Sequence, residues 1–177
     1  MSAYLPILVP KVLTAIARTM AVFGTLGVAA LVLLIDYDII GRQVFNQPIV
    51  GVAELAALGI VVVVFLQAPY ALAQDRMIRT DMLINMLKRK SARLGMAFEA
   101  VLALAGAAIF GIVVFACFPE FLKHLSNGDA YGDPAVFLLP KWPTTLVVTI
   151  GSFAMAVIYL FQAYGWLRRA LTSEDAA

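Results

Sequence analysis

The sequence predicts an all-α integral membrane protein with four transmembrane helices and both termini in the cytoplasm. Of its 177 residues, 63% are apolar and only 14% are charged, whereas soluble domains are about half apolar and a quarter charged. Four stretches without Asp, Glu, Lys or Arg are long enough, or nearly so, to cross a hydrocarbon core of about 30 Å. These stretches are 19–35, 55–74, 100–118 and 142–167.

The four spans are expected at 19–43, 52–74, 97–119 and 142–167, in one membrane domain covering 1–177. The first apolar stretch is short, so we extend its helix past Asp36 and Asp38, which brings both carboxylates near the far interface. Two further segments, 4–18 and 81–93, combine apolar and basic side chains and are predicted to lie as short amphipathic helices on the membrane surface.

The distribution of positive charge predicts the orientation. All but three of the 13 Lys and Arg residues lie before the first span, between the second and third spans, or after the fourth. The three on the opposite side are Arg42, Lys123 and Lys141. Because Lys and Arg in short loops stay in the cytoplasm, both termini and the middle connection are expected there. These basic residues either enforce topology alone or also recognise membrane lipids.

Small and hydroxylated residues recur at helical spacing in the last two spans. Ala103, Ala107 and Gly111 are four residues apart in the third span. The fourth span carries a longer stripe: Thr145, Thr149, Ser152, Ala156, Tyr159 and Ala163. Such stripes let helices approach closely in a membrane. They predict either packing within this bundle or docking to another membrane subunit.

The second span holds a third stripe, which is polar and surrounds a proline. Gln67, Tyr70 and Gln74 flank Pro69, which removes a backbone donor and can bend the helix. The stripe either lines a pathway or is satisfied by a neighbouring helix.

The connection between the first two spans predicts a charged hairpin. Asp38 and Arg42 are four residues apart and can pair along the helix surface. Asn46 and Pro48 lie in a turn sequence, and Glu54 falls in the first turn of the second span, where the helix dipole favours a carboxylate. A capped hairpin at an interface explains these residues without naming a function.

Several classes of function are poorly supported by the sequence. One cysteine, Cys117, and one histidine, His124, offer no intrachain disulfide and no clustered metal ligands, so no metal or other cofactor is expected. No ionisable residue lies near the centre of a span, where a proton relay or a counter-ion would be placed. Convergent catalytic groups are also missing, which argues against an enzyme. A stand-alone four-helix channel or carrier remains an alternative.

The order of residues around the hairpin resembles the DctQ-like family, the small membrane subunits of tripartite ATP-independent periplasmic (TRAP) transporters. The resemblance is strongest over 36–87. The residues that carry it are Arg42, Phe45-Asn46, Pro48, Gly51, Glu54-Leu55, Tyr70-Ala71-Leu72 and Ile78-Arg79-Thr80-Asp81-Met82-Leu83. Two positions depart from the pattern: many members have an acidic residue where Ala53 stands and a histidine where Met77 stands.

The resemblance implies a non-enzymatic accessory subunit of a sodium-driven transporter for small organic acids in the bacterial inner membrane. Its partners would be a large DctM-like membrane subunit, a periplasmic DctP-like solute-binding protein and membrane lipids, with no nucleic acid. Sodium would be bound in the large subunit. The resemblance also implies that Arg42 and Glu54 hold the rim of the hairpin, and that Arg79 with Asp81 fixes the cytoplasmic turn.

Overall fold

The computed structural model describes residues 10–47, 49, 51–74, 92–131 and 138–172. These residues form four long helices and one very short antiparallel ribbon. The helices are α1 (Lys11–Val44), α2 (Val52–Ala73), α4 (Ala92–Asn127) and α5 (Trp142–Thr172), and the ribbon pairs β1 (Ala130–Tyr131) with β2 (Leu139–Pro140). Each of the four helices is long and apolar enough to cross a membrane. The prediction of an all-α protein with four apolar spans is therefore confirmed, and the ribbon was not foreseen.

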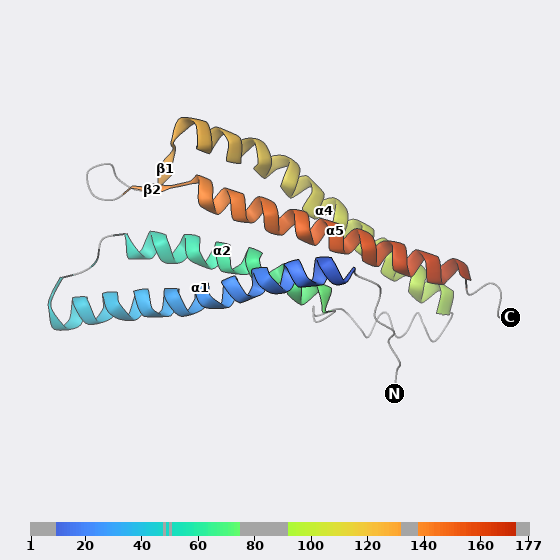
Figure 1. The fold of residues 1–177 in the computed structure, drawn as a ribbon, viewed down its shortest axis with the longest axis horizontal. Helices are drawn as coiled ribbons and strands as arrows, with labels where there is room; N and C mark the ends of the chain where they lie inside the picture. The colour runs from blue at the N-terminus through green and yellow to red at the C-terminus, as the bar shows by residue number, and fades with distance from the viewer. Residues whose placement is uncertain (1–9, 48, 50, 75–91, 132–137, 173–177) are drawn as a thin grey trace.

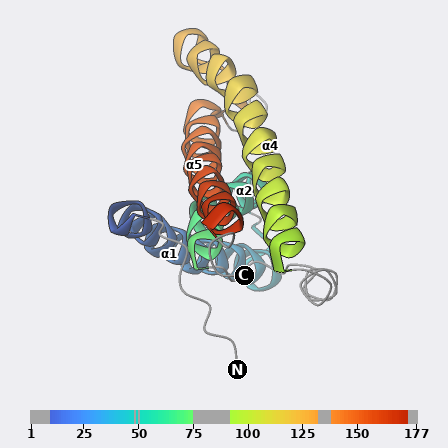
Figure 2. The ribbon, with the colours of Figure 1, turned by 90° about the vertical axis from the view of Figure 1, so that its right-hand side faces the viewer.

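The helices form two antiparallel hairpins, α1–α2 and α4–α5, which are joined mainly through contacts between α2 and α5 (Figure 1). The hairpins lie close together where α1 begins and α5 ends, and they diverge towards the opposite end. Viewed along the long axis, α5 lies between α4 and the α1–α2 hairpin (Figure 2). The helix α5 is consequently the most enclosed of the four.

The observed helices extend beyond the expected spans at several ends. Helix α1 starts at Lys11, directly after Pro10, whose carbonyl accepts the first helical hydrogen bond from the amide of Thr14 at 3.1 Å. Residues 11–18, expected on the membrane surface, thus continue into the first span. Helix α4 runs through Pro119 to Asn127. Of the second expected surface helix, 81–91 lie outside the described residues and 92–93 open α4.

Close approach between α1 and α2 depends on small residues in α1. The side of α1 that faces α2 repeats at alternating steps of three and four residues, and it includes the buried Ala17, Gly24 and Asp38. A Cβ added at Gly24 would lie 2.7 Å from Cγ of Gln67. The two backbones can therefore pack only because this position has no side chain.

The contact between the hairpins also depends on a glycine. A Cβ added at Gly151 in α5 would collide with the carbonyl oxygen of Phe65 in α2. Pro69 has no N–H to donate to this carbonyl, so one backbone hydrogen bond of α2 is missing where α5 crosses it, although the helix continues. Nearby, Nε2 of Gln162 donates a hydrogen bond of 3.1 Å to the carbonyl of Leu72. This buried amide joins the two hairpins.

Candidate functional site

A buried carboxylate closes the α1–α2 hairpin. Oδ2 of Asp38 accepts a hydrogen bond from Nη2 of Arg42 at 2.8 Å, and Oδ1 accepts one from the backbone amide of Ile49 at 2.9 Å. Asp38 is 7% exposed, whereas the Arg42 side chain is 63% exposed. The carboxylate therefore ties the end of α1 to the segment that leads into α2, and the guanidinium faces outward.

The turn itself uses two residues in the left-handed region of backbone space. Asn46 has φ 52° and Gly51, which precedes α2, has φ 87°. Asparagine is one of the few residues other than glycine that adopts this conformation readily. The amides of Phe45 and Gln47 both donate to the carbonyl of Gly41, which ends α1. Pro48 lies outside the described residues.

Glu54 occupies the position expected for it, in the first turn of α2. Its side chain is exposed, beside the exposed Ala53. The positive end of the helix dipole favours a carboxylate there, and the side chain remains accessible from outside the chain. The other charged pair of the motif, Arg79 and Asp81, lies outside the described residues.

The α4–α5 hairpin carries a second charged cluster at the same end of the molecule. Nδ1 of His124 lies 2.8 Å from Oδ2 of Asp129, and Nζ of Lys123 lies 2.7 Å from Oε1 of Glu120. The backbone amide of Lys141 donates to the carbonyl of Asp129 at 3.0 Å. This cluster was not predicted from the sequence, although the three-residue spacing of Glu120 and Lys123 on a helix indicates their pair.

The stripe of small residues in α4 divides between two surroundings. Ala103 and Ala107 are buried, but Gly111 is exposed, and a Cβ added there would meet nothing within 4 Å. The glycine that packs against α5 is instead Gly106, where an added Cβ would lie 2.9 Å from the Tyr159 ring. Gly111 therefore belongs to the outer surface of this chain.

The stripe in α5 packs mostly inside the bundle. Ser152 is 0% exposed, and the ring of Tyr159 stacks on Phe110 with centroids 5.9 Å apart. The hydroxyls of Thr145 and Thr149 donate to carbonyls of their own helix, at 3.1 Å to Trp142 and 2.7 Å to Thr145. Ser152 is thus covered by this chain, so its side chain is not accessible to a partner.

Taken together, these side chains close turns and join helices. Within the described residues, no group of three or more His, Cys, Asp or Glu side chains could hold a metal ion. The fold and its polar residues define a multi-pass membrane protein with two charged hairpin ends and glycine-dependent helix contacts.

Comparison with known families shows the family to which this multi-pass chain belongs. Residues 31–169 match the family model of the DctQ component of tripartite ATP-independent periplasmic transporters. The match covers most of the chain, and the chain belongs to the DctQ family, the small, non-enzymatic membrane component of TRAP transporters. The resemblance found in the sequence is confirmed. No curated protein and no solved structure matched the chain.

Proposed function

We propose that this chain supports a large DctM-like subunit in the bacterial inner membrane, in a transporter that takes up small organic acids with sodium. The family match over 31–169 carries the proposal, because the DctQ family implies a tripartite complex with DctM and DctP components. In that complex the DctP-like protein captures the solute in the periplasm, and the DctM-like subunit carries it and binds the sodium. The present chain supplies no solute ligand.

The exposure of the helices supports an accessory role. In the most apolar part of each helix, only 6% of the residues of α1 and 11% of those of α4 are buried inside the chain. In α5 the share is 33%. Helices α1 and α4 therefore offer wide apolar faces to lipid or to another membrane subunit. On α4 this face includes Ile112 and Phe115, which are 67% and 82% exposed and follow the open position of Gly111.

The arrangement of charges supports an orientation with both termini in the cytoplasm. Lys11, Arg18, Arg168 and Arg169 lie at one end of the bundle, here called the basic end, where α1 begins and α5 ends (Figure 1). Arg42, Lys123 and Lys141 lie at the opposite end, here called the rim. By the positive-inside rule the basic end faces the cytoplasm, and the rim faces the periplasm. Arg42 and Glu54 are then accessible to the solute-binding protein.

Reconstitution in liposomes tests this function directly. This chain, the DctM-like subunit and the DctP-like protein are reconstituted singly, in all pairs and as a complete set, and sodium-driven uptake of the organic acid is followed. We expect uptake only with the complete set. Uptake without this chain would contradict the accessory role, and solute flux through this chain alone would favour a stand-alone channel or carrier.

A further inference from the structure

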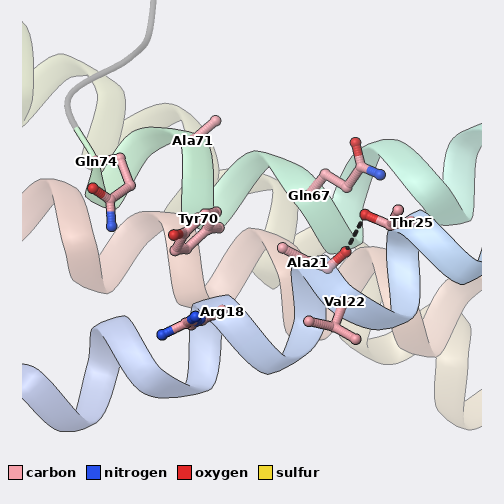
Figure 3. Close-up of a pocket in the computed structure, with 8 residues that line it drawn as sticks. All are labelled: Arg18, Ala21, Val22, Thr25, Gln67, Tyr70, Ala71 and Gln74. Atoms are coloured by element: carbon pink, nitrogen blue, oxygen red, sulfur yellow. Dashed lines mark hydrogen bonds between the residues drawn. The ribbon is translucent and has the colours of Figure 1, made fainter.

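A groove between α1 and α2 is not used by the proposed function. It has a volume of about 360 Å³. Helix α1 contributes Arg18 and the small apolar residues Ala21 and Val22, and α2 contributes the polar stripe that surrounds Pro69 (Figure 3). The stripe consists of Gln67, Tyr70 and Gln74. Arg18, Val22 and Gln74 are exposed, so the groove opens to the outside of the bundle.

The polar groups gather at one end of this groove. The side chains of Arg18, Tyr70 and Gln74 lie together there, and Gln67 lies towards the other end (Figure 3). In the described part of the chain, no carboxylate forms a salt bridge with Arg18. The hydroxyl of Thr25, by contrast, donates to the carbonyl of Ala21 at 3.0 Å within its own helix. A cation with a neighbouring phenol and amide is thus available to an anion.

The position of the groove favours an amphipathic anion over a small soluble one. Arg18 directly precedes the charge-free stretch 19–35, which places it at the depth of a headgroup when α1 crosses the membrane. Beyond it, α1 presents exposed apolar side chains in the direction of the membrane centre. Val22, Phe23 and Leu26 are 54%, 67% and 62% exposed. An acyl chain can cover this surface, whereas a free phosphate ion cannot.

We propose that this groove binds an anionic phospholipid of the leaflet at the basic end. Arg18 pairs with the phosphate, because a guanidinium forms strong charge-assisted hydrogen bonds with phosphate oxygens. The Tyr70 hydroxyl and the Gln74 amide donate to the remaining oxygens, and Ala21 with Val22 forms the wall for an acyl chain. The lipid occupies the seam between α1 and α2 on the membrane side, and the site does not depend on transport.

Lipid binding to the full-length chain tests the proposal. The purified protein is titrated with phosphatidylglycerol in phosphatidylcholine nanodiscs, and bound lipid is counted by native mass spectrometry after release. We expect Arg18→Gln to weaken phosphatidylglycerol binding about tenfold, the effect of losing one charge-assisted contact. Lys11→Gln is the matched control, because Lys11 is also an exposed cation near the start of α1 and does not line the groove. We expect it to bind like the parent.

A second variant tests the apolar wall without changing any charge. Val22→Trp fills the groove beside Arg18 and should also reduce phosphatidylglycerol binding, while circular dichroism confirms that the helices are retained.

Three outcomes would overturn the proposal. Equal losses of phosphatidylglycerol binding in Arg18→Gln and Lys11→Gln would show unspecific electrostatic attraction instead of a site. Equal binding of phosphatidylcholine would do the same. Saturable binding of inorganic phosphate that competes with the lipid and is lost in Arg18→Gln would overturn the lipid as the occupant.

Discussion

Asp38 shows how much of a single interaction can be predicted from sequence. The four-residue spacing predicted its pair with Arg42, and the structure contains that pair at 2.8 Å. The second partner, the amide of Ile49, is eleven residues away and was not predicted. This amide reaches the carboxylate only because the chain reverses at Asn46. The left-handed φ of Asn46 cannot be predicted from residue spacing.

Replacing Asp38 should therefore loosen the hairpin more than replacing a neighbouring carboxylate. Asp38→Ala removes both the acceptor for the Ile49 amide and the partner of Arg42, and it leaves that amide unsatisfied. We expect a lower thermal unfolding midpoint in detergent, with little change for Asp36→Ala, since Asp36 is exposed on the same helix. Equal midpoints for the two variants would show that the carboxylate does not hold the turn.

Among the helices, α4 shows where sequence spacing misleads. Residues four apart advance about 40° around a helix of 3.6 residues per turn, so a stripe of three such residues rotates by roughly 80°. Ala103 and Ala107 still face α5, but Gly111 has turned to the outer surface. Helix α4 also leans away from the rest of the bundle in this half (Figure 2). A regular spacing therefore predicted one face where the structure has two.

Opposite outcomes are expected when the same substitution is made at Gly106 and at Gly111 of α4. Gly106→Leu pushes a side chain into the Tyr159 ring and should destabilise the isolated chain by about 1–3 kcal/mol, the usual cost of overpacking. The side chain added by Gly111→Leu meets open space, so the stability of the isolated chain should not change. If the outer face of α4 contacts the DctM-like subunit, Gly111→Leu should instead reduce co-purification of the two subunits.

Thermal unfolding of the isolated chain and pull-down of the DctM-like subunit measure the two effects separately. If Gly111→Leu co-purifies normally with the DctM-like subunit, this face of α4 does not contact that subunit. Ser152→Leu is unsuited to this purpose, because Ser152 is covered within the chain and its replacement would disturb the bundle first.

At the scale of the whole molecule, the sequence predicted the number of spans but not how the hairpins meet. Charge-free stretches predict spans because charged groups are costly in hydrocarbon. Charge-free stretches predict the ends of the helices less well. Helix α1 includes the charged Lys11 and Arg18, and α4 continues through Pro119. The contact between α2 and α5 depends on Gly151 against the carbonyl of Phe65, and a single glycine in an apolar span has no periodic signal.

The orientation can be measured with cysteines at the two ends of the bundle. In a Cys117→Ala background, Asn46→Cys and Asn127→Cys at the rim should react with an impermeant thiol reagent added to the periplasmic side. Thr172→Cys at the basic end should react only after the membrane is permeabilised. All three positions are exposed, so accessibility within the chain does not limit the reaction. Reaction of Thr172→Cys alone in intact cells would reverse the orientation.

The pairing of helices has a consequence for the order in which the chain assembles during synthesis. Each hairpin joins helices that are neighbours in sequence, so its contacts are local and can form as soon as its second helix leaves the translocon. The contact of α2 with α5 must wait until α5 has been synthesised at least as far as Gln162, and it then needs one alignment, with Gly151 opposite Phe65. We expect the first hairpin to insert and pair before the second is made, leaving its α5-binding side in lipid for that interval.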